Sequence, residues 1–419
     1  MAKLGPCGVL SHVRRALFRK EISKFQKTNH SAYSNFLQAH FERLTGEATV
    51  KSLPYIMVID PSSMCQLRCP ICPTGIENER RRTNDQNRFR DRAMINPELF
   101  DSLLKEVGEY LFLIMFYNWG EPLFYKKLPE LIRKAKTYDI YTEINTNLSF
   151  RLTDDFVIDL LSSGIDDLAA SIDGFSQASY SIYRRGGNFE LAKSNIKRLA
   201  KTRDQLGLRT NIIWNFLVFS FNEHEINAAR EFCDSNGIIF RRREAFIEHP
   251  LWLPSYRKGE LDKPPVADPK SSDNVAIDTR NLPTAKFSGC AWHYSYSVVN
   301  ANGTVSPCCA VWEQEHDFGR LEPGKESFKS IWNNNLFRKS RSFLSGKTID
   351  ELGNISTLCT ECPFNEVVKD QYSFYDKNIL RQFRRIADVR DPILERAFDL
   401  LHRHQSKFIH FYRENLEKL

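Results

Sequence analysis

The sequence predicts an α/β protein built around six parallel strands, each followed by a helix. Strand-like and helix-like segments alternate from residue 52 to about residue 245, which is the pattern of repeated βα units. Within this region, Pro97 follows Asn96 in the way that a first-turn proline follows a helix cap. The 419 residues exceed one average domain, and an apolar content of 42% is ample for a packed core.

The alternating region contains six apolar segments that we expect to be strands and five periodic segments that we expect to be helices. The expected strands are 55–59, 111–117, 140–145, 167–171, 211–219 and 238–241. The expected helices are 97–107, 126–137, 154–163, 189–205 and 223–235. Thr153 and Asn222 are cap candidates for the third and fifth of these helices. In such a fold, catalytic residues lie on the loops that follow the strands.

Both ends of the chain are expected to be helical extensions. A basic segment at 10–45 has one apolar face, which packs on the body of the protein or, less often for such helices, lies on a membrane surface. This face consists of Leu10, Val13, Leu17, Phe18, Ile22 and Phe25. The C-terminal segment 375–419 is broken at Asp391-Pro392 and should cover apolar surface on the body. Its apolar face consists of Ile379, Leu380, Phe383, Ile386, Ile393, Phe398 and Leu401.

Three cysteines, Cys65, Cys69 and Cys72, lie directly after the first expected strand. Three thiolates can hold three irons of a [4Fe-4S] cluster and leave the fourth iron without a protein ligand. A zinc site would normally need a fourth ligand nearby, and a ferredoxin motif would need a further cysteine. Disulfides are disfavoured because the N-terminus carries no signal peptide. The motif therefore indicates a cluster with an open iron, which favours catalysis over electron carriage.

The C-x3-C-x2-C spacing resembles that of the radical S-adenosylmethionine (SAM) superfamily, and further motifs extend the resemblance. Gly120-Glu121-Pro122 follows the second strand, although Trp119 replaces the first glycine of the superfamily's Gly-Gly-Glu-Pro turn. Asn145-Thr146-Asn147 ends the third strand, and Ser171-Ile-Asp173-Gly174 ends the fourth. The resemblance implies a partial (β/α)6 TIM-like barrel. It also implies a set of SAM contacts: Gly120, Glu121, Pro122, Asn147, Ser171, Asp173, Arg184 and Asn222.

Two of these assignments leave alternatives open. Either Arg184 or Arg185 could pair with the methionine carboxylate of SAM, and the spacing favours Arg184. Asn222 is equally suited to a cofactor contact and to a plain helix cap.

A second cysteine group resembles the start of the SPASM pattern and, because no cysteine follows Cys362, its shorter twitch form. The implied ligands of one auxiliary [4Fe-4S] cluster are Cys290, Cys308, Cys359 and Cys362. A hairpin with Asn302-Gly303 at its turn should bring Cys290 and Cys308 to one side. Structural zinc is the alternative for these four thiols. Cys309 should point away from Cys308 if that residue lies on a strand, and is then either a buried apolar residue or a free thiol near substrate.

These observations divide the chain into five expected parts. They are a basic helical extension at 1–50, the radical SAM partial barrel at 52–246, a proline-rich linker at 247–287, a small β-hairpin-plus-helix auxiliary cluster domain at 288–368, and a helical extension at 369–419.

The resemblance implies reductive cleavage of SAM to a 5′-deoxyadenosyl radical, which removes a hydrogen atom from the substrate. An auxiliary cluster with four cysteine ligands has no open iron, so its expected role is to accept an electron. This favours an oxidoreductase acting on an anionic sugar- or cyclitol-like substrate. The alternatives are a ribosomal peptide maturase, which cross-links or epimerises its substrate, and a non-catalytic iron–sulfur electron carrier. The SAM-site motifs argue against the electron carrier.

The expected partners follow from the same chemistry. Flavodoxin or ferredoxin is the expected reductant, and a reducing cytoplasm suits the oxygen-sensitive clusters. No run of about 18 apolar residues is present to span a membrane. No nucleic-acid-binding module is recognisable, and a net charge of +7 says little about partners unless the charge is clustered.

Two arginine-rich segments suggest an anionic substrate. Six arginines lie between Glu77 and Arg92, on the expected loop leaving the cluster. Arg241, Arg242 and Arg243 end the sixth expected strand. Arginines on a catalytic rim suit phosphate or carboxylate groups, and the equally weighted alternative is pairing with neighbouring acids.

Overall fold

The computed structural model describes residues 30–82, 88–244, 252–254, 290–346, 357–362, 396–397, 400–401 and 405–415. Apart from 252–254, the predicted linker lies outside the described residues. The predicted apolar face of residues 10–25 and most of the predicted C-terminal face also lie outside them.

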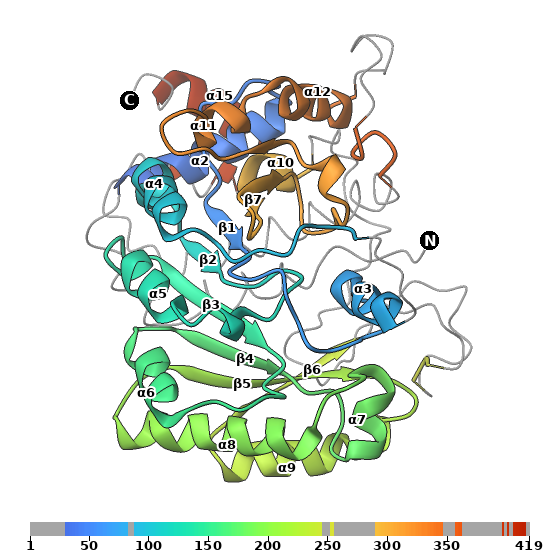
Figure 1. Cartoon of the computed structure of the whole chain (residues 1–419). Coiled ribbons are helices and arrows are strands. Elements are labelled where there is room, and N and C mark those ends of the chain that lie inside the picture. Colours follow the sequence, from blue (N-terminus) through green and yellow to red (C-terminus); the bar gives the residue numbers. More distant parts are fainter. Residues whose placement is uncertain are drawn as a thin grey trace.

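A nine-stranded sheet forms the centre of the molecule (Figure 1). Its strands are β1 (Ile56–Ile59), β2 (Leu113–Met115), β3 (Tyr141–Thr146), β4 (Asp167–Ser171), β5 (Asn211–Val218), β6 (Ile239–Glu244), β7 (Tyr296–Val299), β8 (Thr304–Ser306) and β9 (Gly319–Arg320). Their order is β6-β5-β4-β3-β2-β1-β7-β8-β9, so the described strands form an open sheet and not a closed barrel. Strands β1 to β6 are parallel to their neighbours, as predicted.

The hairpin of the second cysteine region extends this same sheet. Strand β7 runs parallel to β1, and β8 and β9 then pair antiparallel. The turn between β7 and β8 contains Gly303 at φ +85°, the left-handed conformation that the predicted Asn-Gly turn requires. The two cysteine regions therefore share one continuous sheet.

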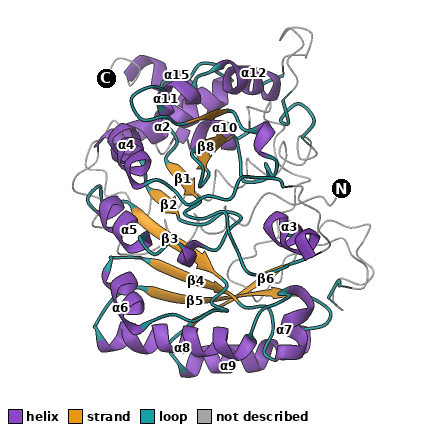
Figure 2. Cartoon of the chain, viewed as in Figure 1, coloured by secondary structure: helices purple, strands orange, loops and turns teal. Residues whose placement is uncertain are grey.

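Helices follow most strands and cover one face of the sheet (Figure 2). They are α4 (Pro97–Val107), α5 (Leu128–Lys136), α6 (Asp154–Ser162), α8 (Phe189–Gln205) and α9 (Ile226–Ser235). Each turns apolar residues toward the sheet, as Leu103 of α4 and Ile196 of α8 do, and these join one large buried core. Helix α4 shows why the chain folds here, because Asn96 caps it by accepting from the Glu98 N–H and Pro97 fixes its first turn.

Several short helices complete the described fold. They are α3 (Pro73–Arg82), η2 (Gly108–Tyr110), η3 (Pro122–Phe124), α7 (Gln177–Tyr183), η4 (Glu223–Glu225), α10 (Trp292–Ser295), η7 (Gln314–His316), α11 (Phe328–Trp332) and α12 (Asn335–Leu344). Helix α3 corrects the sequence analysis, which treated its arginine-rich residues as a loop. Its N-terminus is fixed by the cysteine loop, a tertiary contact that periodicity does not reveal.

A second apolar cluster joins the two ends of the chain. Helices α2 (His30–Thr45) and α15 (Gln405–Asn415) lie side by side at the top of Figure 1. Phe36 of α2 packs on Tyr55 beside β1, and Tyr412 of α15 stacks on Phe41 with ring centroids 4.4 Å apart. In their described parts, both extensions therefore pack on the body, as the sequence favoured. None of the described helices is both long and apolar enough to cross a membrane.

Candidate active site

The three-cysteine loop leaves the end of β1. Cys69 is buried, and Cys65 and Cys72 are half-buried. Burial, followed by the Glu121 carboxylate and the other two thiols, raises the pKa of Cys65 well above its usual value. Burial also raises the pKa of Cys72 to about 11. Bare thiolates are thus disfavoured here at neutral pH, whereas bound metal deprotonates its thiol ligands. The thiols therefore suit a positively charged iron centre.

Helix α3 holds the cysteine loop from one side. Its first-turn N–H groups, from Thr74 and Gly75, point at Cys72 and oppose the rise in its pKa. Gly75 has no room for a side chain, because a Cβ atom would lie 2.3 Å from the Cys69 carbonyl oxygen. The Asn78 side-chain amide donates to the Cys65 and Leu67 carbonyls, both at 2.8 Å. These contacts fix the backbone of the loop independently of any cluster.

The Gly120-Glu121-Pro122 turn packs directly against the start of the cysteine loop. A Cβ atom on Gly120 would lie 1.5 Å from the Ser62 carbonyl oxygen, so only glycine fits. The Glu121 N–H donates to the Met64 carbonyl at 2.8 Å. The predicted SAM-binding turn and the predicted cluster loop are therefore in contact.

Glu121 also joins the turn to the end of β3. Its carboxylate accepts from the Thr146 hydroxyl at 2.6 Å and from the Asn147 N–H at 2.9 Å. Burial raises the pKa of Glu121 to about 7, opposed by these hydrogen bonds. The Asn147 side-chain Nδ2 lies 3.6 Å from Cys65 Sγ and donates to Gln66 at 3.3 Å. Two predicted SAM residues thus border the cluster loop.

Arg184 and Asp173 form the next part of the site. Arg184 Nε donates to Asp173 Oδ2 at 2.6 Å, and its Nη1 lies 4.0 Å from Cys69 Sγ. Asp173 is fully buried, and burial raises its pKa against the opposing effect of Arg184. Arg185 is exposed and its carbonyl accepts from the Arg68 N–H of the cysteine loop at 2.9 Å, whereas it is the Arg184 side chain that reaches the Cys69 sulfur. Ser171 lies nearby in sequence and donates to the Asn145 side chain at 2.9 Å.

Asn222 holds backbone instead of capping a helix. Its amide nitrogen donates to the Asp173 carbonyl at 3.2 Å and to the Leu217 carbonyl at 2.8 Å, while its oxygen accepts from the Phe219 N–H. It makes no capping hydrogen bond to η4, so the cap interpretation is wrong. Asn222 instead ties the loops after β4 and β5 together, and a cofactor contact by this residue stays a prediction.

The second group contains Cys290, Cys308, Cys359 and Cys362, all half-buried. Burial first, and then neighbouring thiols of the same group, raise the pKa of Cys290 and Cys308 to about 12 and that of Cys359 well above its usual value. The four predicted ligands therefore lie within electrostatic reach of one another. Among the described residues, no three His, Cys, Asp or Glu side chains converge as ligands of a single ion would. A cubane cluster needs no such convergence, because each thiolate binds a different iron.

Cys309 belongs to neither set of ligands. It is buried beside Trp292 and Tyr296 in the second apolar cluster, and its sulfur is in a disulfide. Strand β8 ends at Ser306, so the strand alternation used to place Cys309 does not apply. The free-thiol interpretation is therefore wrong, and the buried one is confirmed.

An ion pair and an aromatic pair connect the two cysteine regions. Arg90 donates to both carboxylate oxygens of Asp317, at 2.6 and 2.8 Å, and both side chains are buried. Trp119 contacts Trp312 edge to face, with ring centroids 6.1 Å apart. Trp119 is the residue that departs from the superfamily's turn, and its carbonyl oxygen lies 3.9 Å from Cys72 Sγ. The chain thus uses this position to pack one cysteine region against the other.

Most of the arginines between residues 77 and 92 have partners within the protein. Arg82 lies 3.5 Å from Glu79, Arg90 binds Asp317, and Arg92 donates to Asn78. Arg80 lies over the ring of Phe89. For this segment, the structure supports the alternative of internal pairing over an anion-binding rim.

The three arginines of β6 divide between its two faces, because alternate residues of a strand point to opposite sides. Phe240 packs on Phe216 in the helix-facing core, so Arg242 shares that face. Arg241 and Arg243 lie on the inner face, and Arg241 is 2% exposed. The prediction that all three arginines face one substrate is therefore wrong for Arg242.

The inner face carries a polar cluster that the sequence analysis missed. The Tyr117 hydroxyl, just after β2, lies 3.4 Å from Oε1 of the fully buried Glu143 on β3. Burial and then Glu143 raise the pKa of Tyr117 well above its usual value, while Arg243 and Arg241 oppose the rise. Strands β2 and β6 are separated by three strands in the sheet order, so the sheet curls to bring these side chains together. A glutamate inside an expected buried strand was the available signal.

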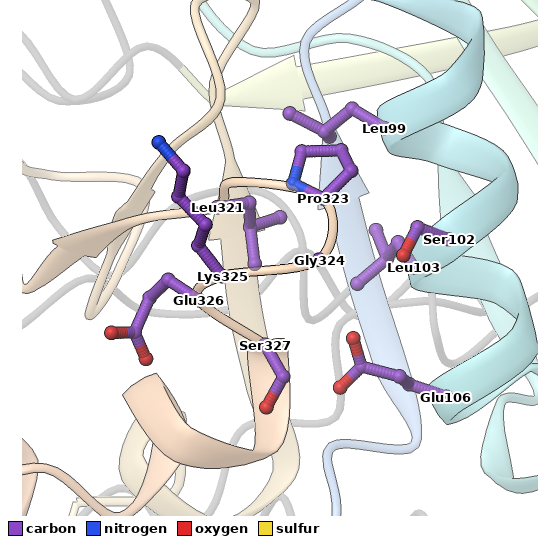
Figure 3. A pocket seen from close by; sticks show the side chains of 10 residues that line it. All are labelled: Leu99, Ser102, Leu103, Glu106, Leu321, Pro323, Gly324, Lys325, Glu326 and Ser327. Atoms are coloured by element: carbon purple, nitrogen blue, oxygen red, sulfur yellow. The ribbon is translucent and has the colours of Figure 1, made fainter.

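A separate surface pocket lies between α4 and the segment after β9 (Figure 3). It has a volume of about 220 Å³ and is lined by Leu99, Ser102, Leu103, Glu106, Leu321, Pro323, Gly324, Lys325, Glu326 and Ser327. None of the predicted site residues lines it.

Comparison with known proteins agrees with this geometry. Residues 59–232 match the radical SAM superfamily, and residues 290–363 match SPASM, an iron–sulfur cluster-binding domain. The chain belongs to the radical SAM superfamily and carries a SPASM-type domain. It is therefore a radical SAM enzyme, and its cofactors are SAM, a [4Fe-4S] cluster and auxiliary iron–sulfur clusters. The SPASM match supports iron–sulfur over structural zinc at the second cysteine group.

Individual relatives are more distant. A PqqA peptide cyclase of Granulibacter bethesdensis is 24% identical over 275 residues, which span 62% of this chain and 68% of the relative. A PqqA peptide cyclase of Streptomyces rochei is 28% identical over 160 residues, or 38% of this chain and 40% of the relative. The structure of SuiB of Streptococcus suis bound to SAM is similar with a TM-score of 0.51 and 16% identity, covering 77% of this chain and 74% of SuiB. At that identity the structural similarity shows the fold alone.

Proposed function

We propose that this enzyme modifies a peptide oxidatively, with the auxiliary cluster accepting an electron from the substrate. The observation that carries the proposal is the similarity to PqqA peptide cyclases, which in one case extends over 275 residues and 62% of this chain. This makes the peptide maturase, which was the alternative from the sequence, the first candidate.

The residues of the first site would have two different roles, cluster binding and SAM binding. When bound, the cluster and SAM supply homolytic cleavage of SAM and removal of a hydrogen atom from an unreactive carbon. Cys65, Cys69 and Cys72 would hold the cluster, and Glu121 and Arg184 would hold the two ends of the methionine group by opposite charge. Glu121 is kept in place by Thr146 and the Asn147 backbone, so it needs no rearrangement to meet an ammonium group.

The inner-face cluster would orient the substrate. Arg241 and Arg243 lie on β6, across the curled sheet from Tyr117. Arg243 and Arg241 both act electrostatically on Tyr117, and guanidinium groups at this part of the inner face would suit an anionic group. We expect an acidic side chain or the C-terminal carboxylate of the peptide to bind there, and flavodoxin or ferredoxin to supply electrons.

An anionic sugar- or cyclitol-like substrate is the second candidate. The inner-face arginines and a four-cysteine auxiliary site suit such a substrate as well as they suit an acidic peptide. The two candidates differ in the size and composition of the molecule that stimulates SAM cleavage.

The test is 5′-deoxyadenosine formation by the anaerobically loaded enzyme with SAM and dithionite. The probes are the peptide fraction and the sugar phosphate and nucleotide-sugar fraction of an extract from the encoding organism. We expect the peptide fraction alone to stimulate the reaction, and its product to lose two hydrogen atoms by mass spectrometry. Stimulation by the sugar fraction alone would overturn the proposal in favour of the second candidate.

Variants of the inner face sharpen this test. Arg241→Ala should raise the KM for the stimulating peptide about tenfold or more, because a lost charged hydrogen bond contributes roughly 1.5–3 kcal/mol. Arg242→Ala, on the opposite face of the same strand, is the matched control and should leave the KM unchanged. Equal effects of the two substitutions would contradict binding at the inner face.

A further inference from the structure

His293 lies beside a ligand of the auxiliary cluster. It follows Cys290 by three residues, in helix α10, and is 2% exposed. Its ring nitrogen Nε2 lies 3.2 Å from Sγ of Cys359, which is 66 residues away in the sequence. The contact therefore joins the first and third cysteines of the auxiliary group through an imidazole.

The surroundings hold this ring in one orientation. It packs edge-on to Phe337 at 5.7 Å and against Phe318 at 6.1 Å between ring centroids. The backbone is fixed as well, since the His293 carbonyl accepts from Nε of the fully buried Arg341 at 2.8 Å. The imidazole thus has little freedom to leave Cys359.

The proton position on the ring follows from the groups around it. A cysteine that binds iron is a thiolate and can only accept a hydrogen bond. Among the described residues, Nδ1 of His293 has no hydrogen-bond partner. A proton on Nδ1 would therefore be a buried donor without an acceptor, whereas a proton on Nε2 has the Cys359 sulfur. Nε2–H donation is the favourable tautomer.

We propose that His293 is a positioning residue that donates its Nε2–H to the Cys359 thiolate and raises the reduction potential of the auxiliary cluster. A hydrogen bond to a ligating sulfur withdraws negative charge and so stabilises the reduced cluster, which carries one more electron. The hydrogen bond itself depends only on the cluster being bound. Its use in accepting a substrate electron depends on the proposed function.

The described contacts of the other thiols differ from this one. Backbone N–H groups of Trp292 and His293 point at Cys290, and those of Ala310 and Val311 point at Cys308. Backbone donors cannot be removed by ordinary substitution, whereas the donors at Cys359 are side chains, the His293 imidazole and the Ser340 hydroxyl. His293 is thus a point where the chain can set the potential of this cluster.

The experiment is a redox titration of the full-length, cluster-loaded enzyme followed by EPR. The two cluster signals are told apart because only the SAM-binding cluster should change when SAM is added. In His293→Leu we expect the ratio of reduced to oxidised auxiliary cluster at a given potential to fall about tenfold, which is a shift of about 59 mV for a one-electron couple. His293→Gln keeps an N–H donor and should recover most of the shift. His316→Leu removes a partly exposed imidazole of the same region and should have no effect.

A measurement on the wild type covers the case in which His293→Leu loses its cluster. After exchange into deuterated buffer, pulsed EPR on the reduced auxiliary cluster should show, beside the backbone N–H protons at Cys290 and Cys308, an exchangeable proton whose coupling changes in His293→Gln. An unchanged potential in a loaded His293→Leu variant would overturn the proposal. Strong coupling to a directly bound imidazole nitrogen, seen with ¹⁵N-histidine, would also overturn it by making His293 a ligand. Either readout stands whatever substrate the enzyme acts on.

Discussion

The two cysteine sites are built in different ways on one sheet. The first takes three thiols from a single loop after β1 and holds that loop with the side chains of Asn78 and Asn147 and the backbone N–H of Glu121. The second gathers thiols from segments spread over residues 290–362, with His293 and Arg341 linking those segments. The thiols of the first site therefore come from local sequence and would leave one iron open, whereas the second site depends on long-range packing and would be closed by four thiols.

The largest expected effect separates the two sites directly. Simultaneous Cys65→Ala, Cys69→Ala and Cys72→Ala should reduce iron from about eight to about four per chain and abolish 5′-deoxyadenosine formation, because each cluster contains four irons. Iron analysis, EPR and the SAM cleavage assay measure these outcomes. Cys233→Ala, in the helix-facing core, is the control and should keep both clusters. Loss of all iron from the triple variant would show that the sites do not assemble independently.

The second prediction tests the rigidity of the local site. In Gly120→Ala, the added methyl group would meet the Ser62 carbonyl, so the turn or the cysteine loop must move. A displacement of about 1 Å commonly costs about 100-fold in rate, and we expect a loss of that order in SAM cleavage. Gly207→Ala is the control, because its Cβ would meet nothing within 4 Å and it strains only the local backbone, at φ +62°. Normal cleavage by Gly120→Ala would mean that the turn is not coupled to the cluster.

The third prediction tests the long-range character of the second site. Arg341 is buried and donates to the carbonyls of His293 and Trp332, both at 2.8 Å. Arg341→Ala should destabilise the fold by about 3 kcal/mol and selectively lower auxiliary iron, because buried carbonyls lose their donor. Thermal unfolding and the EPR signal that is insensitive to SAM measure this. Arg133→Ala, which removes an exposed ion pair between α5 and Asp159 of α6, should cost under about 1 kcal/mol. Equal loss of both clusters in Arg341→Ala would contradict the expectation that Arg341 supports only the second cysteine site.

The smallest expected effect concerns pH at the first site. The pKa of Glu121 is raised to about 7 by burial, so the carboxylate must lose its proton before it can bind the SAM ammonium group. The Kd for SAM should therefore rise up to tenfold for each pH unit below about 7 and level off above it. Glu121→Gln should bind SAM more weakly, with little pH dependence between about 5.5 and 7.5. Calorimetry under anaerobic conditions measures both, and identical pH profiles would rule out this role for Glu121.

Much of the fold and of the first site could be predicted from the sequence, because helices, strands and the three-cysteine loop depend on residues that are close together in the chain. The predicted helices at 97–107 and 189–205 have the bounds observed for α4 and α8. Asn222 shows the limit, since the same residue type before a helix serves as a cap or, as here, binds three backbone groups of neighbouring loops. Which of these two roles Asn222 takes depends on the distance between the folded loops, and the spacing of residues along the sequence does not give that distance.

The sequence alone indicated a radical SAM cluster site and the succession of six strands along the chain. The spacing of Cys65, Cys69 and Cys72 is a property of one loop, and alternation of apolar segments is a property of neighbouring residues. The tertiary structure alone decided that Arg90 binds Asp317, 227 residues away, and that Arg241 faces inward beside Tyr117. The physical reason is that local motifs depend on short stretches of chain, whereas pairing of buried charges depends on how a curled sheet brings distant segments together.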